Sequence, residues 1–173
     1  MPGGALPVPE ADRLIPVINK YIELFTMRNA VTVATRDWHP PNHISFKTRG
    51  GPWPPHCIQN TPGAEFHPDL LLPQHTIIVS KATDPEKEAF SGFDNTELDN
   101  ELRNRGIKRI FVCGVATNYC VKATALDGVR LGYTVILLLD ATKGIEDPPG
   151  SIERALSEML DEGVIMATGS DIE

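Results

Sequence analysis

The fold is decided by residues 109–140, which read RIFVCGVATNYCVKATALDGVRLGYTVILLLD. A short apolar run at 109–114 is followed by a helical pattern at about 118–131 and by a second apolar run at 134–140. Neither run alternates with polar residues, so both strands are expected to be covered on both faces. The order strand, helix, strand predicts parallel strands joined by a helix.

The same alternation extends through most of the chain. Further buried strands are predicted at Val31–Thr35, Thr76–Ser80 and Val164–Thr168, and further helices at 12–28, 96–105 and 151–162. The sequence therefore predicts an α/β fold of three αβα layers around a mostly parallel sheet. At 173 residues, with no internal repeat and no linker-like shift in composition, residues 1–173 are expected to form one domain.

Composition narrows the classes of partner. Hydrophobic residues make up 41% and charged residues 23% of the chain, and the formal net charge is −7. This charge disfavours nucleic acid or an anionic membrane as the main partner and suits a small, near-neutral ligand. The longest apolar run, Val135–Leu139, is far shorter than the roughly 18 residues of a membrane span, so we expect a soluble, cytoplasmic protein.

Carboxylate and imidazole side chains gather just after the strand at Val31–Thr35. Asp37 and His39 lie two residues apart, so they point to the same side if the backbone stays extended. His56 could add a third ligand, and His43 a fourth, for a zinc, iron or manganese ion. The long loop that encloses them favours a metal site over an ordinary polar turn. The remaining histidines, His67 and His75, are expected to be loop residues.

A nucleophile is predicted at the turn that follows the strand at 109–114. Cys120 falls in the first turn of the next helix, where free backbone N–H groups favour a thiolate and an oxyanion. Lys81 ends the strand at Thr76–Ser80 and could hold Cys120 as a thiolate. Cys57 and Cys113 better fit buried packing residues. Three irregularly spaced cysteines do not form a disulfide framework.

Aromatic residues suggest walls for a planar ligand. Trp53 stands among prolines that stiffen its loop, so its ring could lie against an aromatic substrate. The alternative is that Trp53 caps the core. Phe90 and Phe93 flank Ser-Gly and form either a second wall or a packed turn.

Four segments together resemble the nicotinamidases of the isochorismatase-like cysteine hydrolase family, specifically the archaeal type. They are TRDWHPPNHISF at 35–46, GGPWPPHC at 50–57, VSKATD at 79–84 and CGVATNYCVKATALD at 113–127. The resemblance covers nearly all of the chain. It implies hydrolysis of nicotinamide to nicotinate and ammonia through a cysteine thioester, as in NAD salvage, with pyrazinamide as a further substrate.

The resemblance also assigns roles to residues. It implies one divalent metal ion, with zinc favoured over iron or manganese, bound by Asp37, His39 and His56, with His43 as a further ligand in some members. It implies a set of reaction and substrate residues: catalytic Cys120 and Lys81, an oxyanion hole formed by the amides of Ala116 and Cys120 beside a cis Val115–Ala116 peptide, and substrate-binding Trp53 and Tyr119.

The chain departs from the family at its start. Family members carry a strand with an Asp-x-Gln-x-Asp-Phe-like motif directly before the segment that matches PGGALPV at 2–8, and its first Asp completes the catalytic triad. Here Met1 stands in that place, and Glu10 and Asp12 do not match the family position. We expect a misplaced gene start or a shortened chain, with exposed strand edges that favour self-association into a homo-oligomer.

Two alternatives stay open. The chain could be a truncated form or pseudoenzyme that binds metal and nicotinamide without turnover, because the third triad residue is absent. It could instead be a related hydrolase of another small amide or of isochorismate. The resemblance weighs against the second alternative, because metal-free relatives lack the set formed by Asp37, His39 and His56.

Overall fold

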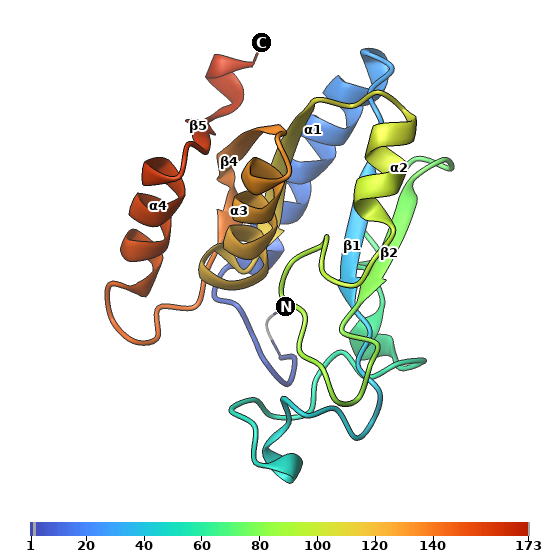
Figure 1. The fold of residues 1–173 in the computed structure, drawn as a ribbon, viewed down its shortest axis with the longest axis vertical. Helices are drawn as coiled ribbons and strands as arrows, with labels where there is room; N and C mark the ends of the chain where they lie inside the picture. The colour runs from blue at the N-terminus through green and yellow to red at the C-terminus, as the bar shows by residue number, and fades with distance from the viewer. Residues whose placement is uncertain (2, 173) are drawn as a thin grey trace.

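The computed structural model describes residues 1 and 3–172, in which strands and helices alternate along the chain (Figure 1). The strands are β1 (Val33–Asp37), β2 (Ile77–Lys81), β3 (Arg109–Val115), β4 (Thr134–Lys143) and β5 (Ile165–Ala167). The α-helices are α1 (Leu14–Met27), α2 (Leu98–Asn104), α3 (Lys122–Arg130) and α4 (Ser151–Asp161). Every strand and helix expected from the sequence is present, with its ends shifted by a few residues.

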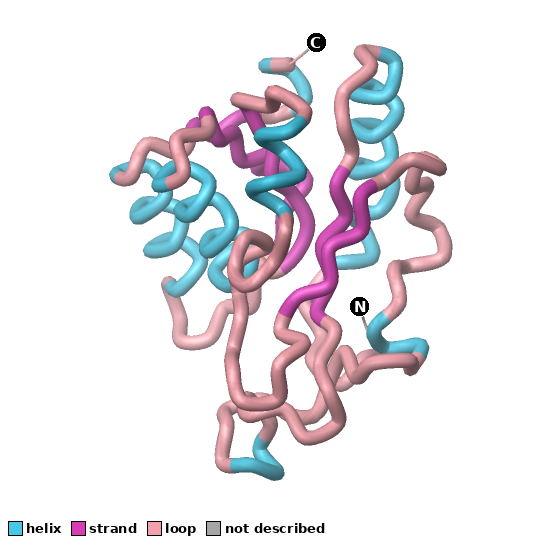
Figure 2. The backbone as a smooth tube through the Cα atoms, turned by 45° about the vertical axis from the view of Figure 1, so that its right-hand side comes forward, coloured by secondary structure: helices cyan, strands magenta, loops and turns pink. Residues whose placement is uncertain are grey.

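All strand pairs in the described residues are parallel, which confirms the α/β class. The strands form two sheets of order β1-β2 and β3-β4-β5, a division that the expectation of a mostly parallel sheet did not specify (Figure 2). Within the described residues, no strand hydrogen-bonds to both sheets. The two sheets are held together by side-chain packing and by the polar contacts of the site described below.

The central strand β4 shows how helices cover both faces of its sheet. Successive side chains of a strand point to opposite faces. Val135 and Leu137 pack into a core that includes residues of α2, α3 and α4, whereas Ile136 and Leu138 pack into a second core with α1. All four side chains are buried. The strand is therefore covered by helices on both faces, as its unbroken apolar sequence predicts.

The strand ends bring distant residues together. In the register of β1 and β2, Asp37 pairs with Lys81, so the last residues of both strands lie side by side. The irregular segment that follows β1 is folded back by two isolated parallel bridges, His39 with Ile58 and Phe46 with Trp53. No described helix is long and apolar enough to cross a membrane.

Candidate active site

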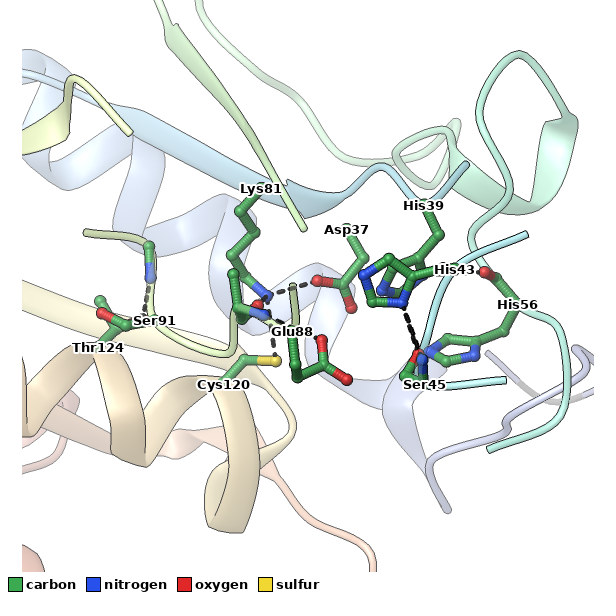
Figure 3. A network of polar contacts seen from close by, with 12 residues as sticks. Asp37, His39, His43, Ser45, His56, Lys81, Glu88, Ser91, Cys120 and Thr124 are labelled. Carbon is green, nitrogen blue, oxygen red and sulfur yellow. Dashed lines mark hydrogen bonds and ion pairs between the residues drawn. The ribbon is translucent and has the colours of Figure 1, made fainter. Parts of the chain in front are cut away.

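A buried ammonium group connects the two sheets. Lys81 is 3% exposed, and its Nζ forms an ion pair with Asp37 Oδ1. Nζ also donates to Ala89 O at 3.0 Å and to Cys120 Sγ at 3.4 Å (Figure 3). Burial alone lowers the pKa of Lys81, but the charges of Cys120 and Asp37 outweigh it and raise the pKa. Lys81 is therefore a cation at neutral pH.

Cys120 lies in a single π-helical turn, Thr117–Val121, that joins β3 to α3. The turn follows the cis Val115–Ala116 peptide that the family resemblance implies. Ala116 O accepts hydrogen bonds from the amides of Tyr119 at 3.0 Å and Val121 at 3.2 Å. Because the first turn of a helix leaves N–H groups without helical partners, this turn suits an oxyanion.

The protonation of Cys120 differs from the expectation. Burial and, to a lesser extent, the charge of Asp37 raise the pKa of the Cys120 thiol to about 11, although the contact with Lys81 lowers it in part. The contact with Lys81 alone therefore does not hold Cys120 as a thiolate at neutral pH. Burial also raises the pKa of Cys57 and of Cys113 to about 11, so this pKa does not distinguish them from Cys120.

Three ligand-type side chains converge beside this pair. One ligand atom each of Asp37, His39 and His56 lies within 4.8 Å of the others. The bridge between His39 and Ile58 is what brings the loop of His56 alongside the end of β1. The spacing Asp-x-His therefore places both side chains on one side, as the sequence suggested.

The hydrogen bonds of the two imidazoles fix their free nitrogens. His39 Nδ1 is 3.0 Å from His56 O, and His56 Nδ1 is 2.8 Å from Pro54 O. A carbonyl oxygen only accepts, so both Nδ1 atoms carry the proton and both Nε2 atoms have a free lone pair. Burial lowers the pKa of His39, which keeps that ring neutral. One carboxylate and two imidazoles form a donor set that suits zinc, iron or manganese.

His43 lies near the three predicted metal ligands, but both of its ring nitrogens form hydrogen bonds. Its ligand atom lies within 4.8 Å of those of His39 and Glu88. However, Nε2 donates to Lys87 O at 2.9 Å, and Nδ1 accepts from the hydroxyl and the amide of Ser45, at 2.7 and 3.3 Å. Both ring nitrogens are occupied, so metal binding by His43 would break these bonds. The fourth-ligand role of His43 stays a prediction that this geometry disfavours.

A cavity of about 180 Å³ opens onto the sulfur and the metal-ligand side chains. Its volume is below the range of drug-sized sites, which favours a ligand with one ring. Trp53 and Tyr119 line it with their rings edge to face, 5.2 Å apart at 84°, and Phe90 lies 6.1 Å from Tyr119. Phe93 instead stacks on Tyr133 in the core.

Sequence reasoning missed an acidic residue of this cavity. Glu88 lines the cavity together with Cys120, and Figure 3 draws both side chains in one polar network. No periodic pattern or motif marks Glu88, because its position depends on contacts with distant residues. A second, more open hollow of about 310 Å³ beside α4 contains none of the predicted metal ligands or catalytic side chains.

Known proteins share this sequence and fold. The isochorismatase domain family matches residues 2–171. The nicotinamidase of Escherichia coli strain K12 is 36% identical over 192 residues, covering 99% of this chain and 90% of the relative. The crystal structure of the pyrazinamidase of Pyrococcus horikoshii in complex with zinc is 58% identical, with a TM-score of 0.93, covering 97% of this chain and 92% of that one.

A structure with a bound ligand is also similar. PnC1 from L. infantum, crystallised in complex with nicotinate, is 37% identical with a TM-score of 0.90, covering 98% of this chain and 86% of that one. Matches of this extent, in sequence and in fold, fit a cavity that is lined by a cysteine and metal-type side chains, with a buried lysine in contact with the cysteine. The chain therefore belongs to the isochorismatase-like hydrolase family, among its nicotinamidase-type members.

Proposed function

We propose that this chain hydrolyses nicotinamide to nicotinate and ammonia, with Cys120 as the nucleophile. The observation that carries this proposal is the chain of contacts from Cys120 through Lys81 to Asp37, which opens into the same cavity as His39 and His56. The E. coli relative is a nicotinamidase, and the L. infantum structure holds nicotinate. The 180 Å³ cavity with its aromatic wall suits a single pyridine ring.

The reaction proceeds in two balanced halves. Cys120 sulfur bonds to the carboxamide carbon, the C–N bond breaks, and the thiol proton leaves on nitrogen as ammonia. Water then adds to the thioester, the C–S bond breaks, and nicotinate departs as the thiol is restored. The amides of Ala116 and Cys120 stabilise the oxyanion in both halves, and Lys81 holds the sulfur and its charge.

We propose zinc as the metal, with Asp37, His39 and His56 as its ligands. The donor set fits, because both Nε2 atoms are free and a carboxylate faces them. The similar P. horikoshii structure contains zinc. When bound, a divalent cation supplies a Lewis acid that can orient the substrate and polarise water.

The direct test is ammonia release from nicotinamide by the purified chain of 173 residues with zinc, iron or manganese supplied. We expect release that disappears in Cys120→Ala, while the variant keeps its metal content. Loss of metal in Cys120→Ala would count against the assignment of the nucleophile. Pyrazinamide turnover by the same protein would support a nicotinamidase over hydrolases of other small amides.

Absence of release would be informative as well. A soluble, metal-loaded protein that binds nicotinamide without turnover would contradict the proposed reaction and would leave a protein that only binds this ligand.

A further inference from the structure

Glu88 is held in the cavity by its neighbours in sequence. Lys87 O accepts from His43 Nε2 at 2.9 Å, and Ala89 O accepts from Lys81 Nζ at 3.0 Å. The backbone is thus clamped on both sides of Glu88 by two buried side chains, His43 and Lys81, which are 0% and 3% exposed. This segment cannot shift without breaking one of these bonds.

The carboxylate of Glu88 faces the reacting groups. One oxygen, Oε1, accepts from the Ala89 amide at 3.0 Å, and the side chain lines the cavity. One oxygen lies within 4.8 Å of a ring nitrogen of His39. Glu88 and Cys120 both line the cavity, and Figure 3 draws both side chains in the same polar network. Among the described residues, no Lys, Arg or His forms an ion pair with Glu88.

The proposed reaction fixes how the substrate amide must point. Its carbon meets the sulfur of Cys120, and its oxygen faces the backbone amides of Ala116 and Cys120. The amide N–H groups must therefore face the remaining polar wall, where Glu88 and Asp37 offer carboxylates. Asp37 is already paired with Lys81 and belongs to the proposed metal set. Among the described residues, Glu88 is the cavity carboxylate that forms no ion pair and lies outside the proposed metal set.

We infer that Glu88 determines specificity for the amide over the acid, by accepting a hydrogen bond from the carboxamide nitrogen of the substrate. An ionised carboxylate only accepts, so it suits an N–H group. The same charge opposes the carboxylate of the product and favours its release. This inference rests on the proposed function, because it requires nicotinamide as substrate and nicotinate as product.

The test compares two variants that remove the same charge from one segment. Glu88→Gln keeps the shape of the side chain, and Glu86→Gln is the control, since Glu86 is exposed and pairs with Arg49 at the surface. The measurements are the KM for nicotinamide and the inhibition constant for nicotinate. A hydrogen bond to a charged group corresponds to roughly 10- to 100-fold in affinity. We therefore expect Glu88→Gln to raise the KM for nicotinamide relative to the inhibition constant for nicotinate by at least about tenfold.

Direct binding separates this inference from the proposed function. Calorimetric titration of nicotinamide and nicotinate into Cys120→Ala, with and without Glu88→Gln, reads affinity without turnover. A ratio that stays within about twofold of the parent, in a protein that binds and hydrolyses nicotinamide, would overturn the role of Glu88 alone. A protein that binds neither ligand would overturn the proposed function and the inference with it. Glu88→Asp, which keeps the charge, should retain the preference for the amide.

Discussion

Replacing Lys81 by Met would test the electrostatic link between the two sheets and the metal site. The substitution removes a 3% exposed ammonium group and leaves Asp37 without its cation and Ala89 O without its donor. Removing one partner of a buried ion pair costs about 3–5 kcal/mol. The Asp37 side chain is 22% exposed, so water recovers part of that energy. We expect the free energy of unfolding of the metal-free protein to fall by about 3 kcal/mol.

Zinc should reduce this loss. A divalent cation on Asp37 compensates the carboxylate in place of Lys81, so the remaining loss is the hydrogen bond to Ala89 O, about 1 kcal/mol. By linkage, the difference of about 2 kcal/mol must appear as roughly 30-fold tighter zinc binding by Lys81→Met.

Urea unfolding in chelator and in saturating zinc measures the loss of stability in the two states. Calorimetric zinc titration measures the change in zinc affinity. Lys20→Met, on the exposed face of α1, controls for the loss of a lysine. Equal destabilisation in both conditions, or weaker zinc binding by Lys81→Met, would refute the idea that Lys81 and the metal share Asp37.

Other substitutions probe the loops and ligands. In Gly51→Ala the new Cβ would lie 2.2 Å from backbone atoms of Ser45, so we expect a lower melting temperature and a raised KM. Gly63→Ala is the control, because its Cβ would meet no atom nearer than 3.7 Å, and it should change neither quantity. His56→Ala should lose the bound metal in elemental analysis, while His43→Ala should keep it and lose stability; loss of metal from both would restore His43 as a ligand. Trp53→Ala should raise the KM for nicotinamide about tenfold with a smaller effect on kcat, and an unchanged KM would remove Trp53 from the substrate wall.

The fold was largely predictable because its signals are local. The apolar runs of β3 and β4 and the helical pattern between them lie within 32 consecutive residues, and burial on both faces of β4 follows from its uniform composition. The sequence predicts a mostly parallel sheet and exposed strand edges, but it does not specify which strands pair within each of the two sheets. The division into two sheets depends on which strands find a hydrogen-bonding partner, and that is a property of the whole chain.

The site was predictable only where its residues share a strand or a turn. Asp37 and His39 converge because they are two residues apart on extended backbone, and Cys120 lies in the turn after β3 as expected. The occupied nitrogens of His43 and the position of Glu88 could not be deduced. Both depend on the hydrogen bond between His43 and the segment of Lys87, which joins residues 44 positions apart.

Asp37 is also expected to couple the proposed metal site to the proposed nucleophile, Cys120. Burial and the charge of Asp37 are the two main causes that raise the pKa of Cys120 to about 11. A divalent cation at Asp37, His39 and His56 would neutralise that carboxylate and remove the second cause, so the pKa of the thiol should fall. The thiolate fraction at a fixed pH below 11 then rises, and alkylation of Cys120 by iodoacetamide should be faster with zinc than with chelator. Peptide mass spectrometry distinguishes Cys120 from Cys57, which lines the same cavity. If zinc left the alkylation rate of Cys120 unchanged across pH 7 to 9, the charge of Asp37 would not control the nucleophile, and the metal would act on the substrate alone.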